Sequence, residues 1–84
     1  MNKFIEKEEK KYVIATLDHP TLYLKKTPAK SEYIFTTDIS IATKAASMHV
    51  AEQIKNYYYC DTGANIDLVV IPVMITFELI DEAN

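Results

Sequence analysis

The stretch from Ile66 to Ile80, IDLVVIPVMITFELI, is the longest apolar run of the chain and decides its fold. β-Branched and aromatic residues dominate it, and these residue types favour strands. Side chains on a strand alternate between two faces. One face is apolar throughout and carries Val69, Ile71, Val73, Ile75, Phe77 and Leu79. The other face turns polar toward its end and carries Leu68, Val70, Pro72, Met74, Thr76 and Glu78. The pattern predicts a strand with one face buried throughout and the other buried over its first half.

Two features of this run restrict how it is used. A membrane-spanning helix needs about 20 apolar residues, and this shorter run contains Asp67 and Glu78, which argues against a span. Pro72 cannot donate a hydrogen bond to a neighbouring strand. We therefore expect a bulge at Pro72 or an edge position for the strand.

The composition indicates one small globular domain. The chain has 84 residues, a net charge of −3, and nine basic residues that are all Lys. The absence of Arg, the usual bidentate reader of phosphate and guanine, argues against a sequence-specific nucleic-acid reader. The single Cys excludes an internal disulfide, and the charged N-terminus lacks the apolar core of a secretory signal. We expect a cytoplasmic protein.

Upstream of the apolar run, the chain predicts three strands. Residues 1–10 are mostly Lys and Glu and predict a loose N-terminal arm. Residues 11–17 and 22–26 predict a β-hairpin with its turn at residues 18–21, where Pro20 favours a turn. Residues 32–36 predict a third short strand.

A helix is predicted between the third strand and the apolar run. Apolar residues recur at steps of three or four from Ile39 to Tyr57, the spacing of one helix face. Ser47 is a candidate N-cap, so the segment is either one rod or a short turn at 39–44 followed by a helix at 47–59. Gly63 suits the C-terminal cap.

The predicted fold class is therefore α+β, with the order β-β-β-α-β. About four strands form a small antiparallel sheet, and one helix packs on one face. The expected contact places Ala42, Ala46, Val50 and Ile54 of the helix against Val69, Ile71, Val73 and Ile75 of the sheet.

The segment from Tyr33 to Ile54 also carries a recurring pattern, Y-x-F-T-x-D-I-x-x-A-T-K-x-x-S-x-x-x-A-x-x-I. In this pattern the chain resembles small accessory proteins of temperate phages of Gram-positive bacteria, staphylococcal phages especially. Ala45 departs from it, because an aromatic residue is usual there. The resemblance implies a phage accessory protein that acts inside a host cell, and it implies neither an enzyme activity nor particular functional residues.

Candidate catalytic and metal-binding residues are sparse. His49 and Cys60 lie about 16 Å apart if both are on one helix, too far for a nucleophile and its base. Two His and one Cys without paired spacing predict no metal site. The lone Gly63 excludes a Gly-rich phosphate loop. We expect no catalytic residue, no metal and no cofactor.

Three consecutive tyrosines, Tyr57, Tyr58 and Tyr59, are the most unusual motif. Adjacent helical positions differ by 100°, so one apolar face cannot hold all three rings. We expect Tyr58 or Tyr59 to be at the rim or in solvent. Tyrosine is enriched at binding hot spots, which makes these three the candidate partner-binding residues, although a Tyr lying along the surface is the more common case.

A second candidate surface combines basic and aromatic residues: Tyr23, Lys25, Lys26, Lys30 and Tyr33. Such surfaces bind single-stranded nucleic acid by stacking. The negative net charge argues against this function, so it remains the alternative to protein binding.

The second face of the final predicted strand, which is apolar at first and polar toward its end, predicts self-association. One helix covers one side of the sheet, which leaves Leu68, Val70 and Met74 exposed on the other. Exposed apolar patches usually mark interfaces, and a symmetric homodimer is the commonest arrangement. The competing prediction is that Phe4, Ile5 and the N-terminal arm fold across that face. Protein–protein interaction with an unidentified host or phage protein is therefore the expected function, without a membrane and without nucleic acid.

Overall fold

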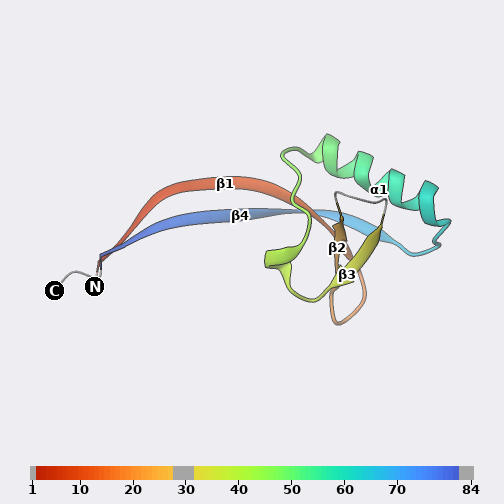
Figure 1. Cartoon of the computed structure of the whole chain (residues 1–84), viewed down its shortest axis with the longest axis horizontal. Coiled ribbons are helices and arrows are strands. Elements are labelled where there is room, and N and C mark those ends of the chain that lie inside the picture. The colour runs from red at the N-terminus through yellow and green to blue at the C-terminus, as the bar shows by residue number, and fades with distance from the viewer. Residues whose placement is uncertain (1, 28–31, 82–84) are drawn as a thin grey trace.

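The computed structural model describes residues 2–27 and 32–81, which form one antiparallel sheet and one α-helix (Figure 1). The sheet has the strand order β3-β2-β1-β4. Its strands are β1 (Asn2–Thr16), β2 (Tyr23–Lys26), β3 (Tyr33–Thr36) and β4 (Leu68–Asp81). A 3-10 turn, η1 (Ile39–Ile41), and the helix α1 (Met48–Thr62) lie between β3 and β4. The predicted α+β class and element order are confirmed.

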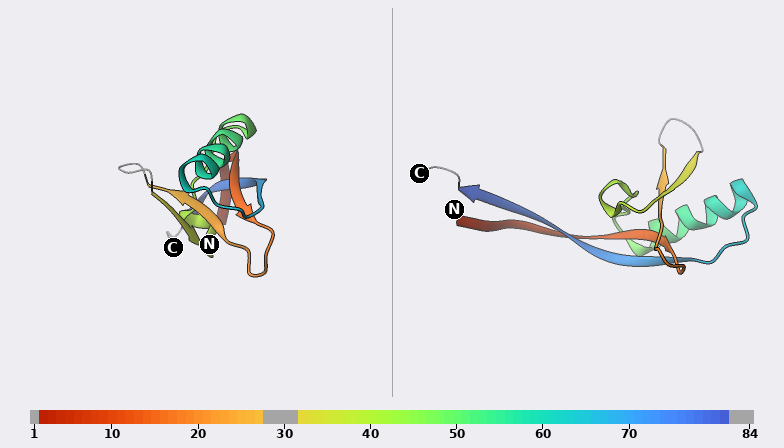
Figure 2. Two further views of the ribbon diagram at one scale, coloured as in Figure 1. Left: turned by 90° about the vertical axis from the view of Figure 1, so that its right-hand side faces the viewer. Right: turned by 90° about the horizontal axis from the view of Figure 1, so that it is seen from below.

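A long two-stranded ladder between β1 and β4 dominates the molecule. Its pairs run from Thr16↔Leu68 to Asn2↔Asp81, with one register shift between Ile5 and Lys7. Beyond the helix and the other strands, the ladder continues as a protruding ribbon (Figure 2). We call "the ribbon" residues 2–11 of β1 together with residues 73–81 of β4. The prediction of a loose arm at residues 1–10 is wrong for residues 2–10, because they pair with β4 on both sides of the register shift.

β4 is an edge strand, and Pro72 pairs in register with Tyr12. The register shift lies elsewhere, so the edge alternative for Pro72 is the one observed. The missing N–H of proline is tolerated on an edge strand.

The other strands are short. β2 and β3 form a four-pair hairpin from Tyr23↔Thr36 to Lys26↔Tyr33. β2 pairs with β1 at Ala15↔Tyr23. Three residues earlier in β1, Tyr12 forms a bridge with Ala45, which belongs to the segment after η1. The inner part of β1 is therefore paired along both edges, whereas among the described residues no further strand pairs with the ribbon.

A side-chain cap at its start and a glycine cap at its end delimit α1. Ser47 Oγ accepts from the Val50 amide at 3.2 Å. At the other end Gly63 adopts a left-handed conformation with φ 64°, and its amide donates to the Tyr59 carbonyl at 2.9 Å. Asp38 caps the separate turn η1. The two-piece alternative for residues 39–59 is therefore the observed one.

The core lies between α1 and the body of the sheet. It comprises Ile14, Leu24, Ala45, Ala51, Tyr58 and Leu68, with Val70, Ile54 and several aromatic rings packed around it. The helix thus faces the strand face that carries Leu68 and Val70, so the predicted packing against Val69, Ile71, Val73 and Ile75 is wrong.

Length accounts for this choice of face. A helix of 15 residues is about 22 Å long, whereas a strand of 14 residues spans about 46 Å. The helix therefore covers only the inner half of β4, which suits the face that is apolar over its first half.

The predicted helix face was also out of phase. Ala46 and Val50 are exposed, Ala42 is buried but precedes the helix, and Ile54 is half-buried. The buried positions of α1 are Ala51 and Tyr58. The capped start at Ser47 sets this phase, whereas the prediction carried the apolar spacing through from the separate turn at residue 39.

The molecule is elongated, with extents of 55 × 25 × 24 Å and a radius of gyration of 15.6 Å. Within the described part of the chain, no helix has the length and apolar character required to cross a membrane.

Candidate functional site

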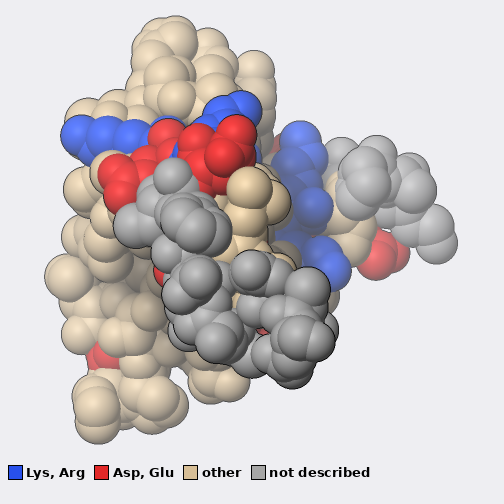
Figure 3. All heavy atoms as spheres, turned by 90° about the vertical axis from the view of Figure 1, so that its left-hand side faces the viewer, with Lys and Arg blue, Asp and Glu red and all other residues tan. Residues whose placement is uncertain are grey.

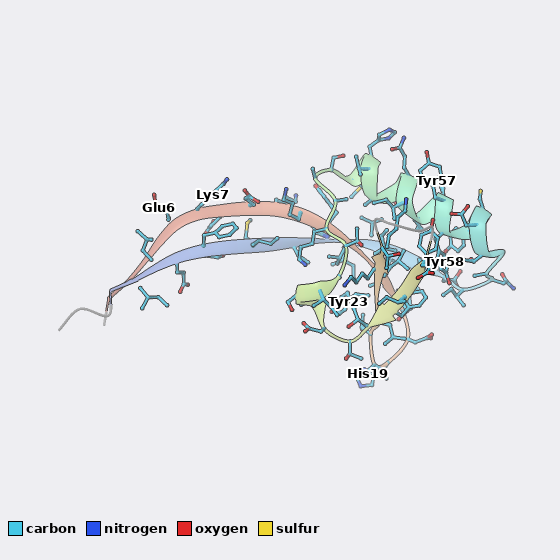
Figure 4. All side chains as sticks on the ribbon, viewed as in Figure 1. Glu6, Lys7, His19, Tyr23, Tyr57 and Tyr58 are labelled. Atoms are coloured by element: carbon cyan, nitrogen blue, oxygen red, sulfur yellow. The ribbon has the colours of Figure 1, made fainter. Side chains whose placement is uncertain are left out.

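The tyrosine triplet divides into one exposed ring and two packed ones. Tyr57 is 55% exposed, whereas Tyr58 is buried between α1 and the β2–β3 hairpin (Figure 4). The hydroxyl of Tyr59 donates to the Ile66 carbonyl at 2.8 Å and accepts from the Leu68 amide at 3.0 Å. The prediction that one ring is exposed is correct, but the exposed ring is Tyr57. Tyr58 and Tyr59 hold the fold together, and of the three predicted partner-binding residues only Tyr57 is largely accessible.

Tyr58 is the centre of an aromatic cluster that joins the helix to β3. Its ring makes edge contacts with Tyr33 and Phe35, at centroid distances of 5.2 and 5.7 Å. The Tyr33 hydroxyl donates to Asp61 Oδ2 at 2.7 Å. Burial of the phenol, together with this hydrogen bond and the negative charge of Asp61, raises the pKa of Tyr33 to about 12. The cluster therefore holds α1 against β3, and its Tyr33 phenol is neutral.

The predicted nucleic-acid surface is divided between two faces of the β2–β3 hairpin. Lys26 pairs with Tyr33 on the side of the helix, where the Lys26 ammonium lies 5.8 Å from the centroid of the Tyr57 ring. Tyr23 and Lys25 alternate with Leu24 and Lys26 along β2 and therefore point to the opposite side. Lys30 lies outside the described residues. A stacking platform needs its rings and cations on one surface, and this set is not brought together in that way.

The predicted self-association residues are also separated. Leu68 is 5% exposed, and both Leu68 and Val70 belong to the packing around the core beneath α1. Only Met74, at 58% exposure, matches the prediction of an exposed residue. The prediction of Leu68 and Val70 as an exposed patch is wrong because the helix packs on their face.

The opposite face of β4 is instead the open one. We call "the β4 stripe" the row Val69, Ile71, Val73, Ile75, Phe77 and Leu79. Exposure is greatest at its outer end, where Phe77 is 50% and Leu79 56% exposed. The alternation in the sequence identified this row, but its predicted cover was the helix, so it was not recognised as a surface.

A shallow apolar hollow adjoins the stripe. It has a volume of about 340 Å³ and lies between the η1 region and β4, lined by Ile39, Ser40, Lys44, Val73, Met74 and Ile75. The Lys44 ammonium donates to the carbonyls of Ser40 and Ala42 at 2.7 and 3.0 Å. The ammonium group that lies beside the hollow is therefore already hydrogen-bonded, and the hollow offers a ligand mainly apolar contacts.

Charged residues flank the outer stripe on β1. Lys7, Glu9 and Lys11 pair in register with Phe77, Ile75 and Val73. Lys7 Nζ lies 2.7 Å and Lys11 Nζ 3.8 Å from the Glu9 carboxylate, and the hydrogen bond and positive charge of Lys7 lower the pKa of Glu9. Basic and acidic groups accordingly adjoin in one band when the molecule is viewed from the end of the ribbon (Figure 3).

Comparisons with protein-family models, curated proteins and solved structures gave no match.

The remaining polar candidates do not assemble. Cys60 and His49 are both exposed on α1, and His19 is exposed in the turn between β1 and β2, on the far side of the molecule from α1 (Figure 4). No cluster of three or more His, Cys, Asp or Glu residues suited to a metal occurs among residues 2–27 and 32–81.

Proposed function

We propose that this protein is a small non-enzymatic accessory protein of the phage type that acts by binding another protein, of the host or the phage. The binding surface is the β4 stripe together with the apolar hollow beside it. The observation that carries the proposal is the half-exposed state of Phe77 and Leu79 at the outer end of a regular apolar row.

Two physical arguments support a protein partner. Contiguous exposed apolar patches are rare on monomers and mark binding sites, and an apolar strand face is suited to contact with other apolar side chains. Nucleic acid would need cations that are free to contact phosphates, whereas Lys7 and Lys11 flank Glu9 along the stripe.

Site-specific photo-crosslinking tests the proposal. A photoreactive phenylalanine analogue at position 77 is expected to form covalent adducts with protein, in purified samples or in a Gram-positive bacterial lysate, and mass spectrometry identifies them. The same analogue at position 80 is the matched control and should give few adducts, because Ile80 lies on the opposite face of β4, is as exposed as Phe77 and does not line the hollow. Equal labelling at both positions, or no protein adduct at position 77, would contradict the proposal.

A mobility shift with single-stranded DNA tests the nucleic-acid alternative. We expect no shift at moderate salt. A shift that weakens steeply as salt rises would instead favour the alternative, because phosphate contacts are salt-dependent.

A further inference from the structure

The outer end of the β4 stripe lacks a cover within the described chain. Its inner residues lie beside the η1 region, but the outer part of β4 extends beyond every other element except β1 (Figure 1). β1 cannot cover them, because residues 2–16 pair with the edge of β4 rather than with its face. The competing prediction, in which the N-terminal arm folds across a sheet face, is therefore wrong.

The molecule exposes more surface than a compact monomer of the same mass. The accessible surface is 6019 Å², whereas a compact monomer of 9.6 kDa exposes about 5,100 Å². The radius of gyration of 15.6 Å exceeds the value of about 12 Å expected for a compact domain of this length. The excess surface, about 900 Å², is close to the roughly 800 Å² that each partner contributes to a standard-size interface.

The charges beside the stripe are compatible with an identical partner. The order Lys7, Glu9, Lys11 along β1 is symmetric about its acidic centre. If two ribbons pack face to face and antiparallel about a twofold axis level with Glu8 and Thr76, Lys7 of each copy lies over Glu9 of the other, so opposite charges meet, whereas an axis level with Glu9 would bring like charges together. An isologous contact uses the same patch twice, so the apolar stripe of one copy would pack against the apolar stripe of the other.

We propose that a second copy of this chain covers the β4 stripe, with the two ribbons packed face to face about a twofold axis. The proposal rests on the proposed function, since it names the partner of the same surface. Phe77 and Leu79 lie at the centre of the contact. The edges of the two β4 strands need not pair, because edge pairing alone would leave the stripe exposed.

Sedimentation equilibrium over a concentration series from low to high micromolar tests the proposal on the full chain. We expect a concentration-dependent species of twice the 9.6 kDa chain mass. Phe77→Lys is expected to weaken self-association by about 30-fold or more, the effect of losing a hot-spot residue. Ile80→Lys adds the same charge to the same strand on the opposite face, at the same exposure and away from the hollow, and is expected to leave the dissociation constant nearly unchanged.

Circular dichroism of both variants checks that the subunits remain folded. A monomer at all concentrations, or equal effects of the two substitutions, would overturn the proposal. These outcomes are distinct from failure of the proposed function, because a monomer whose position 77 still crosslinks to a different protein retains the binding function and loses only the second copy as its partner.

Discussion

At the scale of single residues, the hydrogen bond between Tyr33 and Asp61 links β3 to the end of α1. The two residues are far apart in the sequence, and their 2.7 Å hydrogen bond is exposed to solvent. The bond requires the phenol to keep its proton, which couples this contact to pH.

The titration of Tyr33 gives the first prediction. Its pKa is raised to about 12 in the folded chain, whereas an unfolded tyrosine titrates near 10. The unfolded chain therefore loses this proton first, and the contribution to stability is complete below pH about 10 and is lost as pH rises toward 12. The difference in tyrosinate absorbance between wild type and Tyr33→Phe should show a midpoint near 12.

Asp61→Asn provides the control for that titration. Removing the negative charge should lower the midpoint of Tyr33, although burial of the ring would still keep it above the ordinary value. An unchanged midpoint in Asp61→Asn, or a wild-type midpoint near 10, would contradict the assigned contact.

At the scale of elements, neighbouring tyrosines on α1 have opposite roles. Tyr58 is 7% exposed and contacts Tyr33, Phe35 and Tyr59. Tyr57 is mostly exposed and contacts Lys26 through a cation–π interaction. A helix turns by 100° per residue, so the side chain of Tyr58 points into the aromatic cluster while that of the preceding Tyr57 points to the surface.

Alanine substitution of these two residues tests the phase of the helix. Tyr58→Ala is expected to lower the free energy of unfolding by about 3–5 kcal/mol, as for other large buried aromatic residues. Tyr57→Ala should change it by no more than about 1 kcal/mol, the range of an exposed cation–π contact. Urea denaturation measures both, and the reverse ranking would show that the helix is rotated.

At the scale of the whole molecule, stability is expected to fall along the ribbon. The inner part of β1 is buried at Val13, Ile14 and Ala15, with exposures of 0 to 2%. The ribbon has only two strands, and two-stranded sheets without cover are marginally stable in water. A cover over the stripe would therefore stabilise the ribbon selectively.

Amide hydrogen exchange tests this gradient. In monomeric Phe77→Lys, amides of residues 76–80 should exchange faster than those of residues 13–15, because local opening needs little buried surface to be exposed. In the wild type at high concentration, a second copy should slow exchange in the same outer segment. Uniform protection along β4 in the monomeric variant would contradict the gradient.

The local features of the fold could be predicted from the residue pattern. The period of two from Leu68 onward defined a strand with one fully apolar face, because alternation is a property of the extended backbone. Ser47 and Gly63 marked the helix ends, since both act through hydrogen bonds within a few residues. The α+β class followed from the order of these elements.

The features that depend on distant partners could not be predicted and are seen only in the folded chain. Residues 2–10 have no apolar alternation, and they form a strand because the edge of β4 offers them hydrogen bonds. The face covered by the helix was decided by the length of α1 relative to β4. Burial of Tyr58 rather than Tyr57 followed from where β3 lies against the helix. Each choice depends on contacts between segments far apart in the chain, which neither residue period nor capping chemistry encodes.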